Sequence, residues 1–405
     1  MIRLPPAQSP VDAARNTLPQ PEGRIPELDG LRGIAISLVL VFHCLTTAIA
    51  GRWPNPLAFV KHATQLGWTG VDLFFVLSGF LIGGILLNAR ASANYFQVFY
   101  FRRFCRIFPA YFVFLFFMFF CYHYFLPAHS AVVSEAFLPV MPWYSYVTFT
   151  QNIWMAARDT LGGPVIAITW SLAVEEQFYL TLPAIIRWIS SRVLLGLLIA
   201  GIVAAPLLRF SLLLQLKSSG ASAVYALLPC RMDALLIGVL LVFLLRRNSF
   251  REFVVARTHW IWGFLAVLTI GMIYFNYLAV TNAFPTATFG FTWIAIFYGT
   301  IMVLALTQST SLLARFLRNR WLGRLGVIAY GLYLVHSVVF IIVMTLLRGH
   351  TNVHWSFGDV AASVLSMALS IGIAQVSWLV FEKRFVRWGR TLSYSAPADR
   401  EAEAA

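Results

Sequence analysis

Arg32 and His43 lie eleven residues apart in the first apolar segment of the chain, GLRGIAISLVLVFHCLTTAIA. Ionisable side chains are costly in hydrocarbon, so those that occur within a membrane span are candidates for function. On one helix the two Cα atoms would lie about 16 Å apart along the axis. The arginine can then meet water at one end of the span, while the imidazole lies deep inside it. A desolvated neutral imidazole can accept a proton near pH 7, which makes His43 a candidate general base.

A general base needs a group that orients it, and the segment TWSLAVEEQFYL offers two carboxylates. Glu175 and Glu176 lie about ten residues into a later apolar run at residues 165–188, at a depth similar to that of His43. Neighbouring residues project about 100° apart on a helix, so we expect only one of the two to face the interior, and we favour Glu175. The structural alternatives are a histidine that packs between helices and a glutamate that pairs with another span.

A cluster of arginines opens the third apolar run, in FRRFCRIFPAY. Arg102, Arg103 and Arg106 put two or three guanidinium groups on adjacent faces of a helix within about one turn. Guanidinium groups bind phosphate through paired hydrogen bonds, so a nucleotide-bearing cofactor could bind here from the cytosol. The alternative is ordinary cytoplasmic charge that contacts lipid headgroups.

A second histidine within an apolar run, His336, is flanked by Tyr330 and Tyr333 in AYGLYLVHS. We interpret it as a structural residue that is held by hydrogen bonds in the core. The cysteines show neither metal-ligand spacing nor a paired framework, so we interpret them as core residues and expect no metal. These cysteines are Cys44, Cys105, Cys121 and Cys230.

The elements that position these residues are predicted to be membrane helices. The chain has 405 residues, of which 60% are hydrophobic and 11% charged, and its mean hydropathy is +0.76. Soluble domains carry about 25% charged residues, so the composition indicates an all-α polytopic membrane protein. Proline and polar residues interrupt the stretch 137–155, where we expect a re-entrant or interfacial element. Ten apolar runs are long enough to span a bilayer, at 30–50, 67–88, 108–127, 165–188, 193–212, 222–245, 260–280, 289–307, 326–347 and 357–380.

The formal net charge of +14 is distributed unevenly between the two sides of the predicted membrane domain. With ten spans and an internal N-terminus, all but seven of the 30 Lys and Arg residues fall on the cytoplasmic side. This asymmetry follows the positive-inside rule and predicts that both termini are cytoplasmic. It also explains the basic charge without nucleic acid as a partner. The seven outer residues are Arg52, Lys61, Arg158, Arg209, Lys217, Arg231 and Arg348.

We expect one membrane domain at residues 27–388, between two disordered cytoplasmic tails at 1–26 and 389–405. The first tail is polar and rich in proline, a composition that cannot bury enough apolar surface to fold alone. About 25 residues follow the last predicted span, so we expect no additional soluble catalytic domain.

Together these segments resemble the acyltransferase-3 family of integral membrane acyltransferases. The family's arginine, ten residues and a histidine correspond to Arg32 and His43, and its R-x-x-R element to Arg103 and Arg106. The glycine-rich second helix matches GVDLFFVLSGFLIG, the fourth-helix motif matches WSLAVEEQFYL, and two looser motifs match RMDALLIG and YGLYLVH. The resemblance runs from about residue 26 to 388. Some members carry an added extracytoplasmic esterase-like domain, and this chain is similar to the stand-alone members.

The resemblance implies a ten-helix enzyme of the bacterial cytoplasmic (inner) membrane. Such enzymes transfer an acyl group, usually acetyl, from cytosolic acyl-CoA to a hydroxyl of a carbohydrate or of another envelope or secreted molecule. The partners implied are therefore the lipid bilayer, acetyl-CoA or another acyl-CoA, and a hydroxyl acceptor. The sequence leaves open the identity of the acceptor, the length of the acyl chain and the oligomeric state.

Joined to the chemistry of the residues, the resemblance assigns roles to the candidates above. His43, oriented by Glu175, would deprotonate the acceptor hydroxyl or would first take the acyl group itself. Arg32 would hold in place either the cofactor or the end of its own helix. The cofactor-binding candidates are Arg32, Arg102, Arg103 and Arg106.

The rival interpretation is a transporter or flippase, with the same charged residues along a substrate pathway. Ten helices and ionisable groups near the midplane would suit that function. Against it, the sequence shows no inverted repeat and no matched pair of broken helices. A third interpretation is a membrane scaffold without catalytic activity, which would tolerate changes at both His43 and Arg103.

Overall fold

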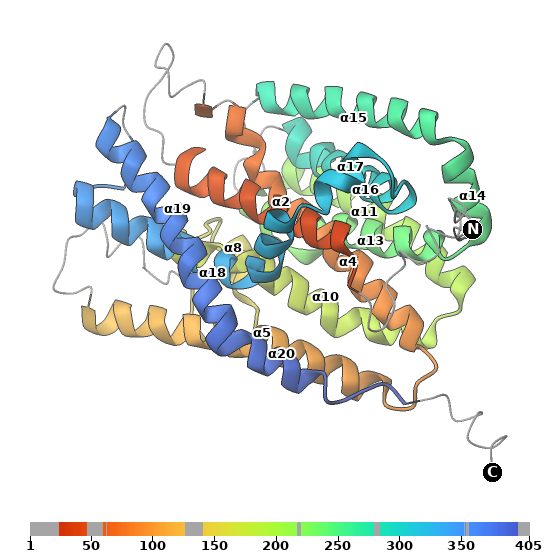
Figure 1. The fold of residues 1–405 in the computed structure, drawn as a ribbon, viewed down its shortest axis with the longest axis horizontal. Coiled ribbons are helices and arrows are strands. Elements are labelled where there is room, and N and C mark those ends of the chain that lie inside the picture. Colours follow the sequence, from red (N-terminus) through yellow and green to blue (C-terminus); the bar gives the residue numbers. More distant parts are fainter. Residues whose placement is uncertain are drawn as a thin grey trace, which may run out of the picture.

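The computed structural model describes residues 24–46, 60–61, 63–125, 141–216, 220–278, 284–351, 353 and 356–395. Across these ranges the chain is almost entirely helical (Figure 1), which confirms the predicted all-α fold class. Most of the two expected tails, at residues 1–23 and 396–405, lies outside the described residues. The first helix, α2, begins at Pro26, where proline fits because its missing N–H has no helical partner in the first turn.

Nine helical segments in the described part of the chain are long and apolar enough to cross a membrane. Each corresponds to a predicted span, and several continue through a π-helical or 3₁₀ turn. They are Pro26–Thr46 (α2 and η1), Gln65–Ala89 (η2 and α4), Tyr95–His123 (α5 and part of η3), Ser191–Leu216 (α11), Ala221–Leu245 (α12 and α13), Thr258–Asn276 (in α15), Thr286–Thr307 (η6 and α16), Arg320–Arg348 (α18) and Phe357–Gly389 (α19, η7 and α20).

The remaining predicted span, 165–188, forms α10 at Thr169–Trp188. Its 20 residues give a length of about 30 Å, which matches the hydrocarbon core. It falls outside the strongly apolar set because its sequence includes Glu175, Glu176 and Arg187. Of the ten predicted spans, the one that departs most from an apolar composition is thus the one that carries the candidate carboxylates.

Short helices precede α10 where a span was not expected. Residues 141–167 form α7 (Trp143–Val147), α8 (Gln151–Ala157) and α9 (Pro164–Ala167), while residues 137–140 lie outside the described residues. Positive φ angles at Phe149 and Asp159 break the helical path between them. The Gln151 Nε2 atom donates to the Thr169 carbonyl at 2.9 Å and thereby anchors the start of α10.

Glycine allows the central helices to pack backbone to backbone. A Cβ atom on Gly79 of α4 would collide with the Leu235 carbonyl of α13 (Leu228–Leu245), and one on Gly238 would collide with the Val76 carbonyl. Gly326 of α18 allows the same approach to α2. Close packing through small residues is a common way for membrane helices to associate. Helices α2, α4, α13 and α18 therefore form the centre of the bundle, and α15 (Thr258–Leu278) lies at its periphery (Figure 1).

Two buried ion pairs reinforce this centre. Arg231 Nη2 on α13 donates to Asp72 Oδ1 on α4 at 2.8 Å, and the guanidinium lies 3.8 Å from the centre of the Phe291 ring. Arg209 Nη2 on α11 donates to Asp233 Oδ2 on α13 at 2.9 Å. All four ionic side chains are at most 1% exposed. The two arginines thus neutralise aspartates inside the bundle and add no charge to the surface.

Candidate functional site

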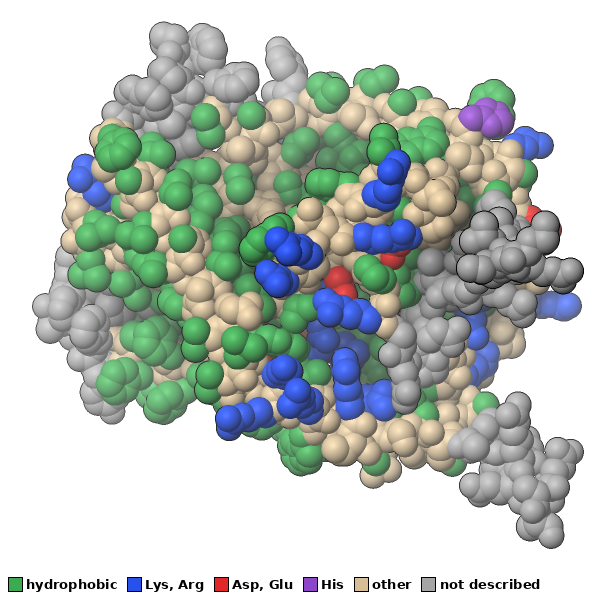
Figure 2. Space-filling view, in the orientation of Figure 1, with side chains coloured by type: hydrophobic (Ala, Val, Ile, Leu, Met, Phe, Trp, Pro, Cys, Tyr) green, Lys and Arg blue, Asp and Glu red, His purple; other side chains and the backbone are tan. Residues whose placement is uncertain are grey.

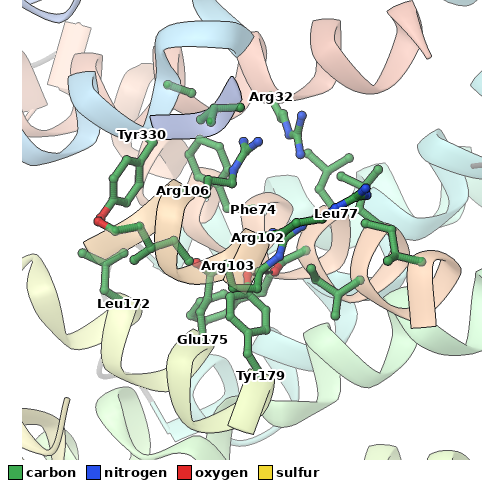
Figure 3. Close-up of a pocket in the computed structure, with 18 of the residues that line it drawn as sticks. Arg32, Phe74, Leu77, Arg102, Arg103, Arg106, Leu172, Glu175, Tyr179 and Tyr330 are labelled. Carbon is green, nitrogen blue, oxygen red and sulfur yellow. Dashed lines mark hydrogen bonds between the residues drawn. The ribbon is translucent and has the colours of Figure 1, made fainter. Parts of the chain in front are cut away.

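A pocket with a volume of about 310 Å³ opens among six helices (Figure 3). Its walls come from α2, α4, α5, α10, α18 and α20, so residues from both ends of the sequence meet here. Five arginines line the pocket against one carboxylate, that of Glu175, which makes it strongly positive. They are Arg32, Arg102, Arg103, Arg106 and Arg390.

Helix α5 (Tyr95–Phe120) positions three of these arginines at its first turns. Arg103 and Arg106 are three residues apart, so they lie on neighbouring parts of one helix face. Figure 3 shows them converging with Arg32 of α2 on the same space. The Arg103 Nε atom is buried and has no hydrogen-bond partner among the described residues. A buried N–H group without a partner is costly, and a bound anion would satisfy it.

The segment after α20 (Lys383–Gly389) crosses the edge of the pocket. Arg102 Nε donates to the Leu392 carbonyl at 3.0 Å, and its guanidinium lies 5.3 Å from the centre of the Tyr394 ring. Asn94 Nδ2 donates to the Ser393 carbonyl at 2.9 Å and holds the same segment to the start of α5. Burial raises the pKa of Tyr394, so its phenol is neutral and can donate a hydrogen bond. Arg390 and Tyr394, within the range 389–405 that was predicted to be a disordered tail, line the pocket.

The two candidate carboxylates have different surroundings. Glu175 lines the pocket and faces the hydroxyl groups of Ser78 and Tyr179, which hydrogen-bond to each other. In Figure 3, Glu175 and Tyr179 lie across the pocket from Arg32. Glu176 does not line the pocket, and its Oε1 atom is buried without a hydrogen-bond partner among the described residues. The geometry therefore selects Glu175 as the carboxylate that can act in the pocket.

His43 lies apart from this pocket, in the π-helical turn η1 (Phe42–Thr46) that continues α2. Its ring centre is 5.0 Å from that of His336 on α18. Single π-turns within helices occur often at functional sites. His43 Nδ1 lies 3.0 Å from the Val39 carbonyl. A carbonyl only accepts, so in the neutral ring Nδ1 carries the hydrogen and Nε2 carries the lone pair.

The structure brings together Arg32, Glu175 and the arginines of α5 around one pocket, and His43 is not among the residues that line it. Similar depth in the membrane does not fix the direction in which two helices face each other. Helices α2 and α10 both pack on α4, and α18 contacts both: its His336 meets His43, while its Tyr333 meets Ser171. The expectation that Glu175 orients His43 therefore stays a prediction.

Two residues of α18 connect the pocket to His43. Tyr333 lines the pocket and donates a hydrogen bond to the Ile168 carbonyl at 2.8 Å. Its ring centre lies 5.8 Å from that of His336, which in turn contacts His43. Tyr333 and His336 are three residues apart in YGLYLVH, so they lie on one face of the helix. The interpretation of His336 as a structural residue did not use this spacing.

This fold and pocket define a polytopic α-helical membrane protein with a basic pocket among its spans and a histidine pair nearby. The acyltransferase-3 family, described as an acyltransferase domain, matches residues 25–378, and the chain belongs to this family. Peptidoglycan O-acetyltransferase OatA of Listeria monocytogenes is 26% identical over 372 residues, which cover 88% of this chain and 55% of that protein. YrhL of Bacillus subtilis, provisionally named a peptidoglycan O-acetyltransferase, is 28% identical over 378 residues, covering 89% and 54% respectively.

The chain therefore spans about half the length of the curated relatives it matches. No solved structure matches the chain significantly. Membership of the family rests on the match to most of the chain, residues 25–378.

Proposed function

We propose that this protein is a membrane O-acetyltransferase whose basic pocket binds acetyl-CoA. The observation that carries the proposal is the cluster of pocket arginines that includes the buried, unpartnered Arg103 Nε atom. The diphosphate and the 3′-phosphate of CoA would supply negative charge and hydrogen-bond acceptor oxygens for these guanidinium groups. Acetyl is the favoured acyl group because the relatives above are named O-acetyltransferases.

In this proposal the arginines of α5 bind the phosphates, and Arg32 closes the pocket from α2. Arg32 Nη1 lies 3.4 Å from Asp29 Oδ1, which holds the guanidinium group beside the first turn of α2. Glu175 faces Arg103 and Arg106, so it orients guanidinium groups in the pocket. This role is separate from the predicted one, in which Glu175 orients His43.

The proposed reaction uses the Nε2 lone pair of His43. This atom takes the proton of the acceptor hydroxyl while the hydroxyl oxygen attacks the thioester carbonyl carbon. The carbon–sulfur bond breaks, and His43 returns the proton to the CoA thiolate, so the enzyme ends unchanged. The alternative route forms an acetyl-His43 intermediate, which the acceptor oxygen then attacks.

The acceptor in this proposal is a carbohydrate hydroxyl of the bacterial envelope. The names of the relatives make peptidoglycan the first acceptor to test. We place both termini in the cytosol, the source of acetyl-CoA, and the protein in the cytoplasmic membrane. Lys and Arg side chains gather beside the pocket, over α17 (Leu312–Leu317), the start of α18 and α20 (Figure 2). The positive-inside rule assigns such a basic region to the cytosol. Residues 27–388 act as one membrane domain.

Purified protein in lipid nanodiscs, supplied with radiolabelled acetyl-CoA and peptidoglycan fragments, tests this proposal. We expect label on the fragments and an equal release of CoA. His43→Ala should lower both by about 10²–10⁴-fold while the protein remains folded, because a positioned base contributes about that much. His259→Ala, at an exposed position on α15, is the matched control. Near-normal turnover by His43→Ala would exclude the base assignment, and movement of an acceptor without CoA release would favour a transporter.

A further inference from the structure

Two imidazole rings meet inside the bundle, and the mechanism above uses only one of them. His336 is completely buried on α18, and its ring centre lies 5.0 Å from that of the half-buried His43, with an angle of 59° between the ring planes. The two residues come from helices that pack closely along their length, α2 and α18. The contact joins two helices at the centre of the bundle, and the two residues that make it are far apart in the sequence.

The hydrogen bonds of His336 fix its tautomer and its orientation. Its Nδ1 atom lies 2.7 Å from the Tyr333 carbonyl and 3.2 Å from the Leu332 carbonyl, so Nδ1 carries the hydrogen. Its Nε2 atom lies 3.3 Å from the Ser337 hydroxyl, which can donate to it. With both nitrogen atoms held from its own helix, His336 presents a neutral ring of defined orientation to His43.

A neutral ring in this place suits the charge that develops on His43 during catalysis. When His43 accepts a proton, its ring becomes an imidazolium next to the π system of His336, and an aromatic ring attracts a neighbouring cation. The preceding turn of α18 carries Tyr333, which lines the pocket. One rigid helix therefore sets both the pocket wall and the ring that supports His43.

We infer that His336 is a positioning residue for His43, which it holds in the reactive orientation and stabilises in the protonated state. The inference rests on the proposed function. His336 itself gains and loses no proton: the proton passes from the acceptor oxygen to His43 Nε2 and then to the CoA sulfur, as above. Support of this kind acts on the transition state more than on the binding of the donor, so it affects kcat rather than KM.

The first test compares His336→Phe, which keeps an aromatic ring without the nitrogen atoms, with His336→Ala and His336→Gln. CoA release from acetyl-CoA is measured with peptidoglycan fragments as acceptor. We expect His336→Ala to lower kcat by about 10–100-fold, with KM for acetyl-CoA within about twofold, and Phe and Gln to recover part of that loss. An unchanged kcat, or a loss that appears only in KM, would overturn the inference.

A double-mutant cycle separates action through His43 from general damage to the fold. If His336 acts through His43, adding His336→Ala to His43→Ala causes no further loss of the residual rate. If the rate losses of the two single variants multiply in the double variant, His336 acts independently of His43, which would contradict the inference. His259→Phe serves as the control substitution, at an exposed site on another helix.

A chemical measurement tests the contact without any activity. Carbethoxylation of His43 by diethyl pyrocarbonate is followed by mass spectrometry of its peptide in folded protein. We expect His336→Ala to raise the rate by about threefold or more, because the ring that packs on His43 is lost, and His336→Phe to stay near wild type. An unchanged rate in His336→Ala would contradict the inference. If the wild type transfers no acetyl group, the proposed function fails. The carbethoxylation rates still show whether His336 packs against His43.

Discussion

The hydroxyl oxygens of Tyr333 and Ser171 lie 2.6 Å apart and join α18 to α10 at the wall of the basic pocket. Tyr333 also donates to the Ile168 carbonyl just before α10, so one phenol ties α18 to the first turn of the helix that carries Glu175. The position of the pocket carboxylate therefore depends on a residue of α18 that lies close to His336.

Removal of this phenol should destabilise the protein measurably. Tyr333→Phe removes the shorter of two side-chain hydrogen bonds to the Ile168 carbonyl and leaves the Ser171 hydroxyl as a donor at 3.2 Å, and we expect a loss of about 1–2 kcal/mol in unfolding free energy. Ser171→Ala should cost less, because Tyr333 keeps its bond to Ile168. Thermal unfolding in detergent measures both variants. A larger effect of Ser171→Ala than of Tyr333→Phe would show that the link through Ile168 is not the main one.

Arg103 should dominate the affinity for the donor. Arg103→Ala should weaken CoA binding by about 10–100-fold, because one charge-assisted hydrogen bond contributes about 1.5–3 kcal/mol. Arg103→Lys should recover only part of this, since an ammonium group cannot bind phosphate through a planar fork. Equilibrium dialysis with radiolabelled CoA at fixed salt measures the affinity. Arg257→Ala, at an exposed position before α15, is the control, and an equal loss there would indicate only general attraction.

The Tyr394 phenol should contribute to donor binding through its hydrogen. Its oxygen is buried without a hydrogen-bond partner among the described residues, and it borders the pocket. We expect Tyr394→Phe to weaken CoA binding by about 5–10-fold, the value of one neutral hydrogen bond. Because the pKa of Tyr394 is raised by burial, the phenol stays protonated as pH rises from 7 to 9, and this contribution should be constant across that range. A contribution that disappears by pH 9 would contradict the assignment.

The ion pair between Asp72 and Arg231 should be strongly asymmetric in its response to substitution. Asp72→Leu leaves a guanidinium group buried without its partner, at a cost of about 3–5 kcal/mol. The double variant with Arg231→Leu removes both charges and should recover much of that loss. Thermal stability of the purified single and double variants tests this. A double variant no more stable than Asp72→Leu would show that Arg231 is held mainly by the Phe291 ring.

Hydropathy was sufficient to predict the helices, because a run of apolar residues long enough to span a bilayer has few other stable conformations. The cluster of Arg102, Arg103 and Arg106 was also predictable, since short spacing on one helix fixes relative positions. The ring that packs against His43 was not. Depth along a helix can be counted in residues, but the direction that a side chain faces depends on how helices pack, and both α4 and α18 contact α2 and α10.

Tyr394 illustrates a second limit. Its surroundings in the sequence are polar and resemble a tail, and nothing local indicates that Asn94 and Arg102 bind the backbone around it. Such contacts between segments almost three hundred residues apart arise only from the complete fold. The composition of a terminal segment therefore predicts its intrinsic tendency to order, and not whether a pocket captures it.

The pocket has a consequence for the synthesis of the protein. It takes Arg32 from the first described helix and Arg390 from the segment after the last one. A growing polypeptide inserts its helices in order, so the pocket is incomplete until residue 390 has left the ribosome. A partly inserted chain would hold the arginines of α2 and α5 without Arg390, and the pocket would be complete only once the segment after α20 has joined it.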